Sequence, residues 1–166
     1  MGEGLTDSEI IAFVAAMPAV TVLTASEEYG APELAWGDTF FFYEPPGAGP
    51  EARRMPFATI VRNDYGGDDA VSELGRPGVF RLNIGVGRER FEDLIGLAPA
   101  AYTTHRDEYD HAAPDTLTPL PVYAAQAWVA ILNPGARTGA LARTLLVEAH
   151  DRARAAHERR RGAAEG

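Results

Sequence analysis

Side chains that could bind a ligand gather on a short segment of alternating residue types. Along Phe80–Ile84 the apolar residues point to one face of a predicted strand, while Arg81 and Asn83 point to the other. One face therefore belongs to a core, and the other places a guanidinium beside a carboxamide, two groups that can hydrogen-bond a polar ligand. The pattern predicts a binding surface without identifying what it binds.

A second predicted strand, Pro121–Leu132, carries further polar and aromatic side chains. We expect it to lie beside the first, so that one pocket or groove is lined by Arg62, Arg81, Asn83, Tyr123, Gln126 and Trp128. Tyr123 and Gln126 have opposite parity along the strand, so both reach this surface only near a bulge or a strand end. The alternative is that the polar residues of the first strand face solvent or bind loop backbone, and that Trp128 is core.

His105 and His111 are the candidate metal ligands, with Asp107 and Asp110 between them. Histidines six residues apart lie on different sides of a helix, so a shared ion would need a loop geometry that spacing alone does not give. The alternative interpretation is a solvated acidic loop. We predict no cofactor, and a metal-assisted enzyme that uses the His105–His111 loop is kept as an alternative function.

The segment Asn83–Arg90 has two glycines where a strand would lead into a helix, as phosphate-binding loops do. A dinucleotide fingerprint would need a third glycine where Arg90 stands, and Glu89 and Glu92 already complement the start of the helix. We interpret the glycines as a strand exit and a helix start. The three serines lie outside any nucleophile pattern, so we assign no catalytic residue.

Charge and composition narrow the classes of function. The 166-residue chain carries 15 basic residues, all of them arginine, against 24 acidic ones, for a net charge of -9. Because nucleic acids bind through neutralising cations, this balance makes a nucleic-acid partner unfavourable. The chain has no cysteine, which excludes disulfides and thiolate chemistry. Without a basic leader or a long apolar run, we expect a cytoplasmic protein with no membrane segment.

The elements that position these residues follow from capping, periodicity and turn signals. Helices are predicted over Asp7–Met17, Arg88–Gly96 and Thr138–Glu158. Strands are predicted over Ala19–Ala25, Asp38–Tyr43, Phe57–Arg62, Val79–Gly85 and Pro121–Leu132. This order predicts a single α+β domain over residues 1–158, with a mainly antiparallel sheet of about five strands packed by an N-terminal helix, a short middle helix and a long C-terminal helix. Residues 159–166 are predicted to be a flexible C-terminal tail.

Three sequence blocks carry a family resemblance: Pro56–Val61, Arg76–Val86 and Pro121–Pro134. With Phe40–Tyr43 ahead of them, they resemble a bacterial family known as domain of unknown function 6194, over about Thr6 to His150. That resemblance implies no activity. The order of elements is also similar to that of the MmcQ/YjbR-like domains, which implies nucleic-acid binding as a second alternative function.

Together these observations favour a binding domain. We expect a small-molecule-binding or protein-interaction domain without catalytic activity, whose partner is a small molecule or a protein. A homodimer is also expected, because the aromatic-rich sheet offers an apolar face or edge to cover.

Overall fold

The computed structural model describes residues 4–30, 36–48, 55–63 and 67–165. The helices are α1 (Asp7–Ala15), α2 (Arg88–Ile95), α3 (Tyr102–His105) and α4 (Gly139–Glu165). The strands are β1 (Val20–Thr24), β2 (Thr39–Tyr43), β3 (Ala58–Val61), β4 (Arg81–Gly85), β5 (Leu117–Pro119) and β6 (Trp128–Leu132). Within the described residues they form one antiparallel sheet of six strands in the order β1-β2-β3-β4-β6-β5. The predicted α+β class is confirmed.

Helix α1 begins where its capping signal predicts. The hydroxyl of Thr6 accepts from the amide of Glu9 at 3.1 Å, and the Glu9 carboxylate accepts from the amide of Thr6 at 3.1 Å. These two bonds satisfy amides at the start of the helix that have no partner within it. Ile10 and Val14 then bury the inner face of α1 against the sheet.

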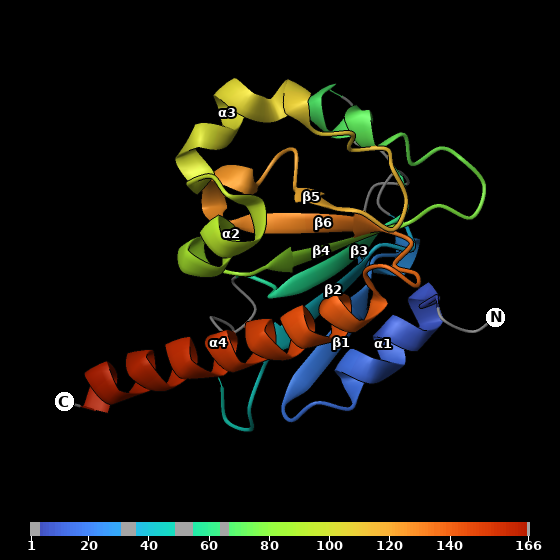
Figure 1. Cartoon of the computed structure of the whole chain (residues 1–166). Helices are drawn as coiled ribbons and strands as arrows, with labels where there is room; N and C mark the ends of the chain where they lie inside the picture. Colours follow the sequence, from blue (N-terminus) through green and yellow to red (C-terminus); the bar gives the residue numbers. More distant parts are fainter. Residues whose placement is uncertain (1–3, 31–35, 49–54, 64–66, 166) are drawn as a thin grey trace.

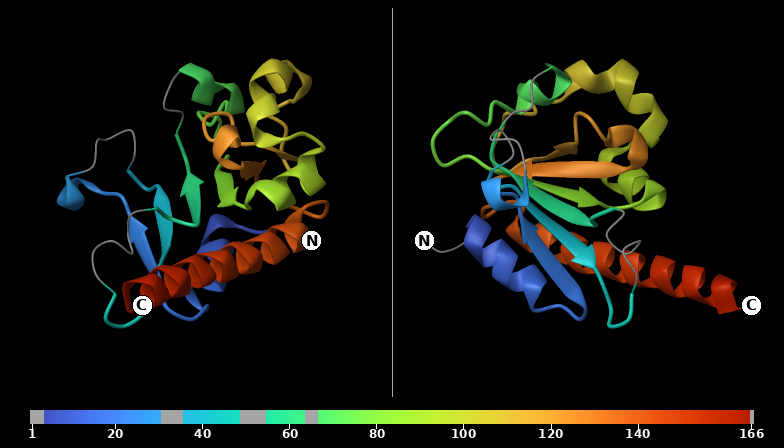
Figure 2. Two further views of the ribbon diagram at one scale, coloured as in Figure 1. Left: turned by 90° about the vertical axis from the view of Figure 1, so that its left-hand side faces the viewer. Right: turned by 180° about the vertical axis from the view of Figure 1, so that it is seen from behind.

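The sheet separates two environments. Helices α1 and α4 lie over one face, and α3 with its neighbouring turns arches over the β5–β6 end of the sheet (Figures 1 and 2). Alternation along β4 places Leu82 and Ile84 in the main core, which also holds Leu145 and Leu146 of α4. Arg81 and Asn83 of the same strand point to the opposite face, as the sequence pattern predicts.

Two residues that are distant in sequence from α4, Asp115 and Pro18, hold the helix in place. At its N-terminus, the Asp115 carboxylate accepts from the amides of Gly135 and Thr138, both at 2.8 Å, and from the Thr138 hydroxyl at 2.6 Å. Further along, the ring nitrogen Nε2 of His150 lies 2.7 Å from the carbonyl oxygen of Pro18. Because that oxygen can only accept, Nε2 carries the proton and donates it.

Three details of the predicted elements differ in the structure. The predicted strand over Pro121–Leu132 is wrong in its first half, because the chain forms a 3-10 turn at Ala124–Gln126 and only then enters β6. Edge strand β5 lies where no element was predicted, which raises the sheet to six strands. Helix α4 also continues through Glu165, past its predicted end at Glu158.

No helix in the described part of the chain is both long enough and apolar enough to span a lipid bilayer.

Candidate functional site

A large hollow lies on the sheet face that α1 and α4 leave uncovered. This cavity, called the sheet-face groove here, has a volume of about 1030 Å³. Its walls come from β1–β4, from α3 and from the turn before β6. The apolar side chains that line it include Leu23, Phe40, Phe42, Val61, Leu120 and Trp128. The described residues along its walls include two arginines and no carboxylate.

A connected set of hydrogen bonds fixes the polar part of the groove. Nε of Arg81 donates to the Asn83 side-chain oxygen at 2.9 Å, and its Nη1 donates to the Ser72 hydroxyl at 2.9 Å. The Asn83 amide nitrogen in turn donates to the Thr59 hydroxyl at 2.9 Å. All four side chains are buried. Bonds between buried partners hold these groups in one geometry, so the polar floor is preorganised.

Burial and hydrogen bonding define the surroundings of Arg81 and Asn83. Neither side chain faces open solvent, since Arg81 and Asn83 are each only 3% exposed. Their hydrogen-bond partners among the described residues include side chains on β3 and on the turn at Gly67–Ser72. Both nevertheless line the sheet-face groove.

Trp128 and Tyr123 form one side of the groove in different ways. Trp128 pairs with Gly85 across the β4–β6 ladder, and its indole covers that glycine. Trp128 is 7% exposed, whereas Tyr123, on the turn before the strand, is 49% exposed. Trp128 therefore belongs to the groove wall, and the Tyr123 hydroxyl lies at the rim.

Tyr102 of α3 also lines the groove, and His111 holds it in place. Its hydroxyl lies 2.9 Å from Nε2 of His111, and both side chains are buried. Burial lowers the pKa of the His111 imidazole, and the positive charges of Arg106 and Arg81 lower it further. Among the described residues, Nδ1 of His111 has no hydrogen-bond partner. His111 thus supports the groove wall as a neutral ring at physiological pH.

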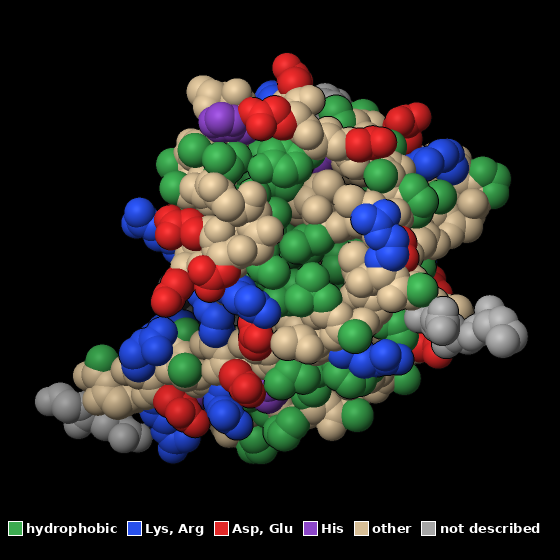
Figure 3. Space-filling model, viewed as in Figure 1, with side chains coloured by type: hydrophobic (Ala, Val, Ile, Leu, Met, Phe, Trp, Pro, Cys, Tyr) green, Lys and Arg blue, Asp and Glu red, His purple; other side chains and the backbone are tan. Residues whose placement is uncertain are grey.

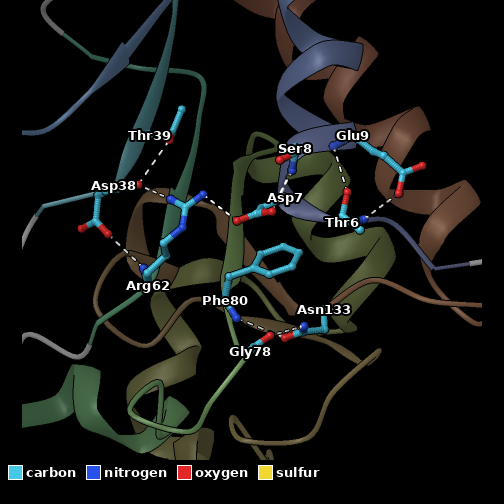
Figure 4. Close-up of polar contacts among 11 residues, drawn as sticks. Thr6, Asp7, Ser8, Glu9, Asp38, Thr39, Arg62, Gly78, Phe80 and Asn133 are labelled. Atoms are coloured by element: carbon cyan, nitrogen blue, oxygen red, sulfur yellow. Dashed lines mark hydrogen bonds and ion pairs between the residues drawn. The ribbon is translucent and has the colours of Figure 1, made fainter.

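Two of the predicted site residues lie elsewhere. Gln126 lines a different cavity, next to α4, together with Trp128. Arg62 follows β3 directly and belongs to a separate polar cluster (Figure 4). Its Nη2 contacts the Asp7 carboxylate at 2.7 Å, and its Nη1 donates to the carbonyl of Gly37. The backbone amide of Arg62 donates to Asp38 at 2.9 Å. Arg62 thus joins β3 to α1 and does not line the sheet-face groove.

The two predicted metal ligands have different partners. Nδ1 of His105 contacts the Glu108 carboxylate, whereas Nε2 of His111 contacts Tyr102. Over the described ranges, no three histidine, cysteine or carboxylate side chains gather in a way that could hold a metal ion.

The two glycines of the segment Asn83–Arg90 have structural roles. Gly87 begins α2 with a φ of 88°, a left-handed value that favours glycine. A Cβ atom at Gly87 would lie 2.6 Å from the guanidinium carbon of Arg152 on α4. The segment therefore combines a strand exit and a helix start, as interpreted from the sequence, with a close approach of α4.

Three residues at the sheet-face groove were not predicted from the sequence: Thr59 and Tyr102, which line it, and Ser72, which accepts a hydrogen bond from Arg81. Thr59 had a usable signal, since alternation in its strand places it on the face opposite Ala58 and Ile60. Ser72 and Tyr102 lie in turn-rich segments where no periodicity indicates direction. Only the tertiary structure brings Tyr102 to the groove and Ser72 to Arg81.

Comparison with known proteins gives one match. A family model described as a family of unknown function (DUF6194) matches residues 5–162. No curated protein and no solved structure matches the chain. The family predicted from the sequence blocks is thereby confirmed.

Proposed function

The chain belongs to the DUF6194 family of unknown function, and from that premise we propose that it is a small-molecule-binding domain whose ligand occupies the sheet-face groove. One observation carries the proposal: a cavity of about 1030 Å³ with an apolar lining surrounds a fixed set of buried polar groups. Ligand sites combine an apolar lining with a few oriented polar groups in this way, and their volumes reach about 1,000 Å³.

The lining indicates what kind of molecule fits. Aromatic and aliphatic side chains such as Phe40, Phe42 and Trp128 would bury an apolar body, at roughly 25 cal/mol per Å² removed from water. The hydroxyls of Thr103 and Tyr123, both on exposed residues at the groove, can donate to an acceptor on the ligand. A flat or aliphatic molecule with at least one hydrogen-bond acceptor is therefore the ligand that this groove favours.

The alternative functions have less support from the described residues. A metal-assisted enzyme would need ligands that His105 and His111 do not bring together, since each has its own partner. Nucleic-acid binding would need a basic surface in a chain of net charge -9. A protein partner stays a prediction, as do the homodimer, the flexible tail at residues 159–166 and the cytoplasmic location.

The test uses Nile red, a neutral dye with a fused-ring body and a carbonyl acceptor. We expect saturable fluorescence enhancement with one dye per folded chain. Val122 lines the groove and is 48% exposed, so Val122→Asp adds a charge at the rim without burying it. Because a bound apolar ligand would remove water from this carboxylate, the variant should weaken dye binding about tenfold or more.

Val147→Asp is the matched control. Val147 is 42% exposed on α4 and lies outside the groove, so the same substitution should leave dye binding within about twofold of the unmodified chain. Circular dichroism establishes that both variants are folded. Equal weakening in both variants, or no saturable binding at all, would contradict the proposal.

A further inference from the structure

A second cavity lies between α4 and the ends of the central strands. This α4 cavity has a volume of about 540 Å³, and its apolar lining includes Tyr43, Phe57 and Trp128 together with Ala149, Ala153 and Ala156 of α4. Figure 1 shows α4 crossing the sheet and continuing past its edge. The part of the helix between Ala149 and Arg160 provides one wall of the cavity. The cavity shares Met55, Pro56 and Trp128 with the sheet-face groove, so the two hollows are neighbours with a common wall.

The charge of the α4 cavity is opposite to that of the whole protein. Its lining includes Arg152, Arg159 and Arg160, and none of the described residues that line it is acidic. The cavity lining is therefore positively charged, although the chain as a whole has 24 acidic and 15 basic residues. Elsewhere along α4, acidic and basic side chains lie side by side (Figure 3). One of the acidic side chains of α4, Glu148, pairs with Arg90 of α2 at 2.9 Å.

The three arginines differ in how firmly they are held. Nη1 of Arg152 donates to the carbonyl of Gly85 at 3.2 Å, and its guanidinium packs against Gly87, where a side chain would leave no room. In the part of the chain that the structure describes, Arg159 and Arg160 have no ion pair. Like charges that line one cavity without a counter-charge repel one another, and a bound anion would relieve that repulsion.

We propose that the α4 cavity binds an organic phosphate monoester, with the phosphate at the three arginines and the apolar part against Tyr43, Phe57 and Trp128. A guanidinium group can donate two parallel hydrogen bonds to the oxygens of a phosphate, and it can stack on an aromatic ring. The cavity has room for a ring-sized body as well as the phosphate. This site is separate from the sheet-face groove and does not depend on the function proposed for it.

The experiment is a calorimetric titration of the full chain with phenyl phosphate. It is run at about pH 7.5, above the second phosphate pKa of about 6, so that the ligand is a dianion. We expect binding with one site per chain and an affinity that falls as salt is added. The double variant Arg159→Gln and Arg160→Gln should raise the Kd about tenfold or more, because it removes two charge-assisted contacts.

Arg137→Gln with Arg143→Gln is the matched control, since both side chains are exposed, lie outside the cavity and carry the same total charge. This control should keep the Kd within about twofold. Equal losses in the two double variants would show a general charge effect and overturn the site. Absence of any binding to the unmodified chain would overturn it as well.

Two further titrations test the role of the apolar wall and the independence of the two cavities. Inorganic phosphate should bind more weakly than phenyl phosphate, and equal affinity would overturn the role of the apolar wall. Val122→Asp, the variant that disturbs the sheet-face groove, should leave phenyl phosphate binding unchanged. Loss of Nile red binding with phenyl phosphate binding intact, or the reverse, distinguishes failure of the proposed groove function from failure of this site.

Discussion

The indole ring of Trp128 lies directly over Gly85, its partner across the β4–β6 ladder. A Cβ atom added at Gly85 would be 2.9 Å from Cε2 of Trp128. The absent side chain therefore makes room for the ring that forms the wall between the two cavities. Both candidate ligand sites depend on this close approach.

Gly85→Ala should lower the free energy of unfolding by about 1–3 kcal/mol, because the methyl group overpacks a buried ring. In a Trp36→Phe background, Trp128 is the sole tryptophan, and its emission reports the displacement. Gly75→Ala is the control, since a Cβ at Gly75 meets nothing within 4 Å. Equal stability of the two variants in urea would contradict the inferred contact.

Asp115→Asn should destabilise the chain by about 1–2 kcal/mol, because the Asp115 carboxylate caps the N-terminal end of α4. Partial burial raises the pKa of Asp115, but hydrogen bonds from Thr138, Arg137 and Gly135 outweigh it and lower the pKa from 3.8 to about 2. A carboxylate with a lowered pKa stabilises the fold above its unfolded pKa, and that contribution is lost as pH falls through the folded one.

The difference in unfolding free energy between the unmodified chain and Asp115→Asn should therefore shrink between pH 3.8 and about pH 2. Urea titrations across this range measure it. Asp93→Asn, on an exposed residue of α2, provides the reference for loss of one surface carboxylate. A difference that stays constant with pH would show that Asp115 acts by shape and not by charge.

His111 should make stability fall on mild acidification. Burial lowers its pKa below the ordinary 6.5, so below that pH the unfolded chain takes up a proton that the folded chain resists. The stabilisation is complete above pH 6.5 and is lost as pH falls toward the folded pKa. His111→Gln should remove this part of the pH dependence, measured by urea unfolding at several pH values.

Tyr102→Phe is the companion variant for His111. It deletes the hydroxyl 2.9 Å from Nε2 but leaves the imidazole buried, so stability should drop while the slope with pH persists. If His111→Gln retained the full slope, another group would be responsible for it.

Features that depend on neighbouring residues could be predicted from residue types and spacing. The capping box of Thr6 and Glu9 is local, and it begins α1 where predicted. Alternation along Phe80–Ile84 is also local, so the two faces of β4 follow from residue types alone. The α+β class follows from the order of such elements.

Tertiary structure decided what depends on partners distant in sequence. Ala127 adopts a left-handed backbone with a φ of 66°, which ends the turn at Ala124–Gln126, and no glycine or proline there signals it. That turn moves Tyr123 to the rim of the sheet-face groove and Gln126 to the α4 cavity. Arg62, at the end of β3, is drawn to Asp7, 55 positions earlier.

Both candidate sites likewise depend on partners that are distant in sequence. Arg81 and Asn83 could be recognised as a pair in the sequence. Ser72, Tyr102 and the arginines of α4 come to lie beside them or their neighbours only when the sheet and the helices pack together. A cavity is a property of surfaces from several elements, and residue spacing within one element does not encode it. Local residue patterns thus determine the strands, and the packing of those strands with the helices determines which side chains share a site.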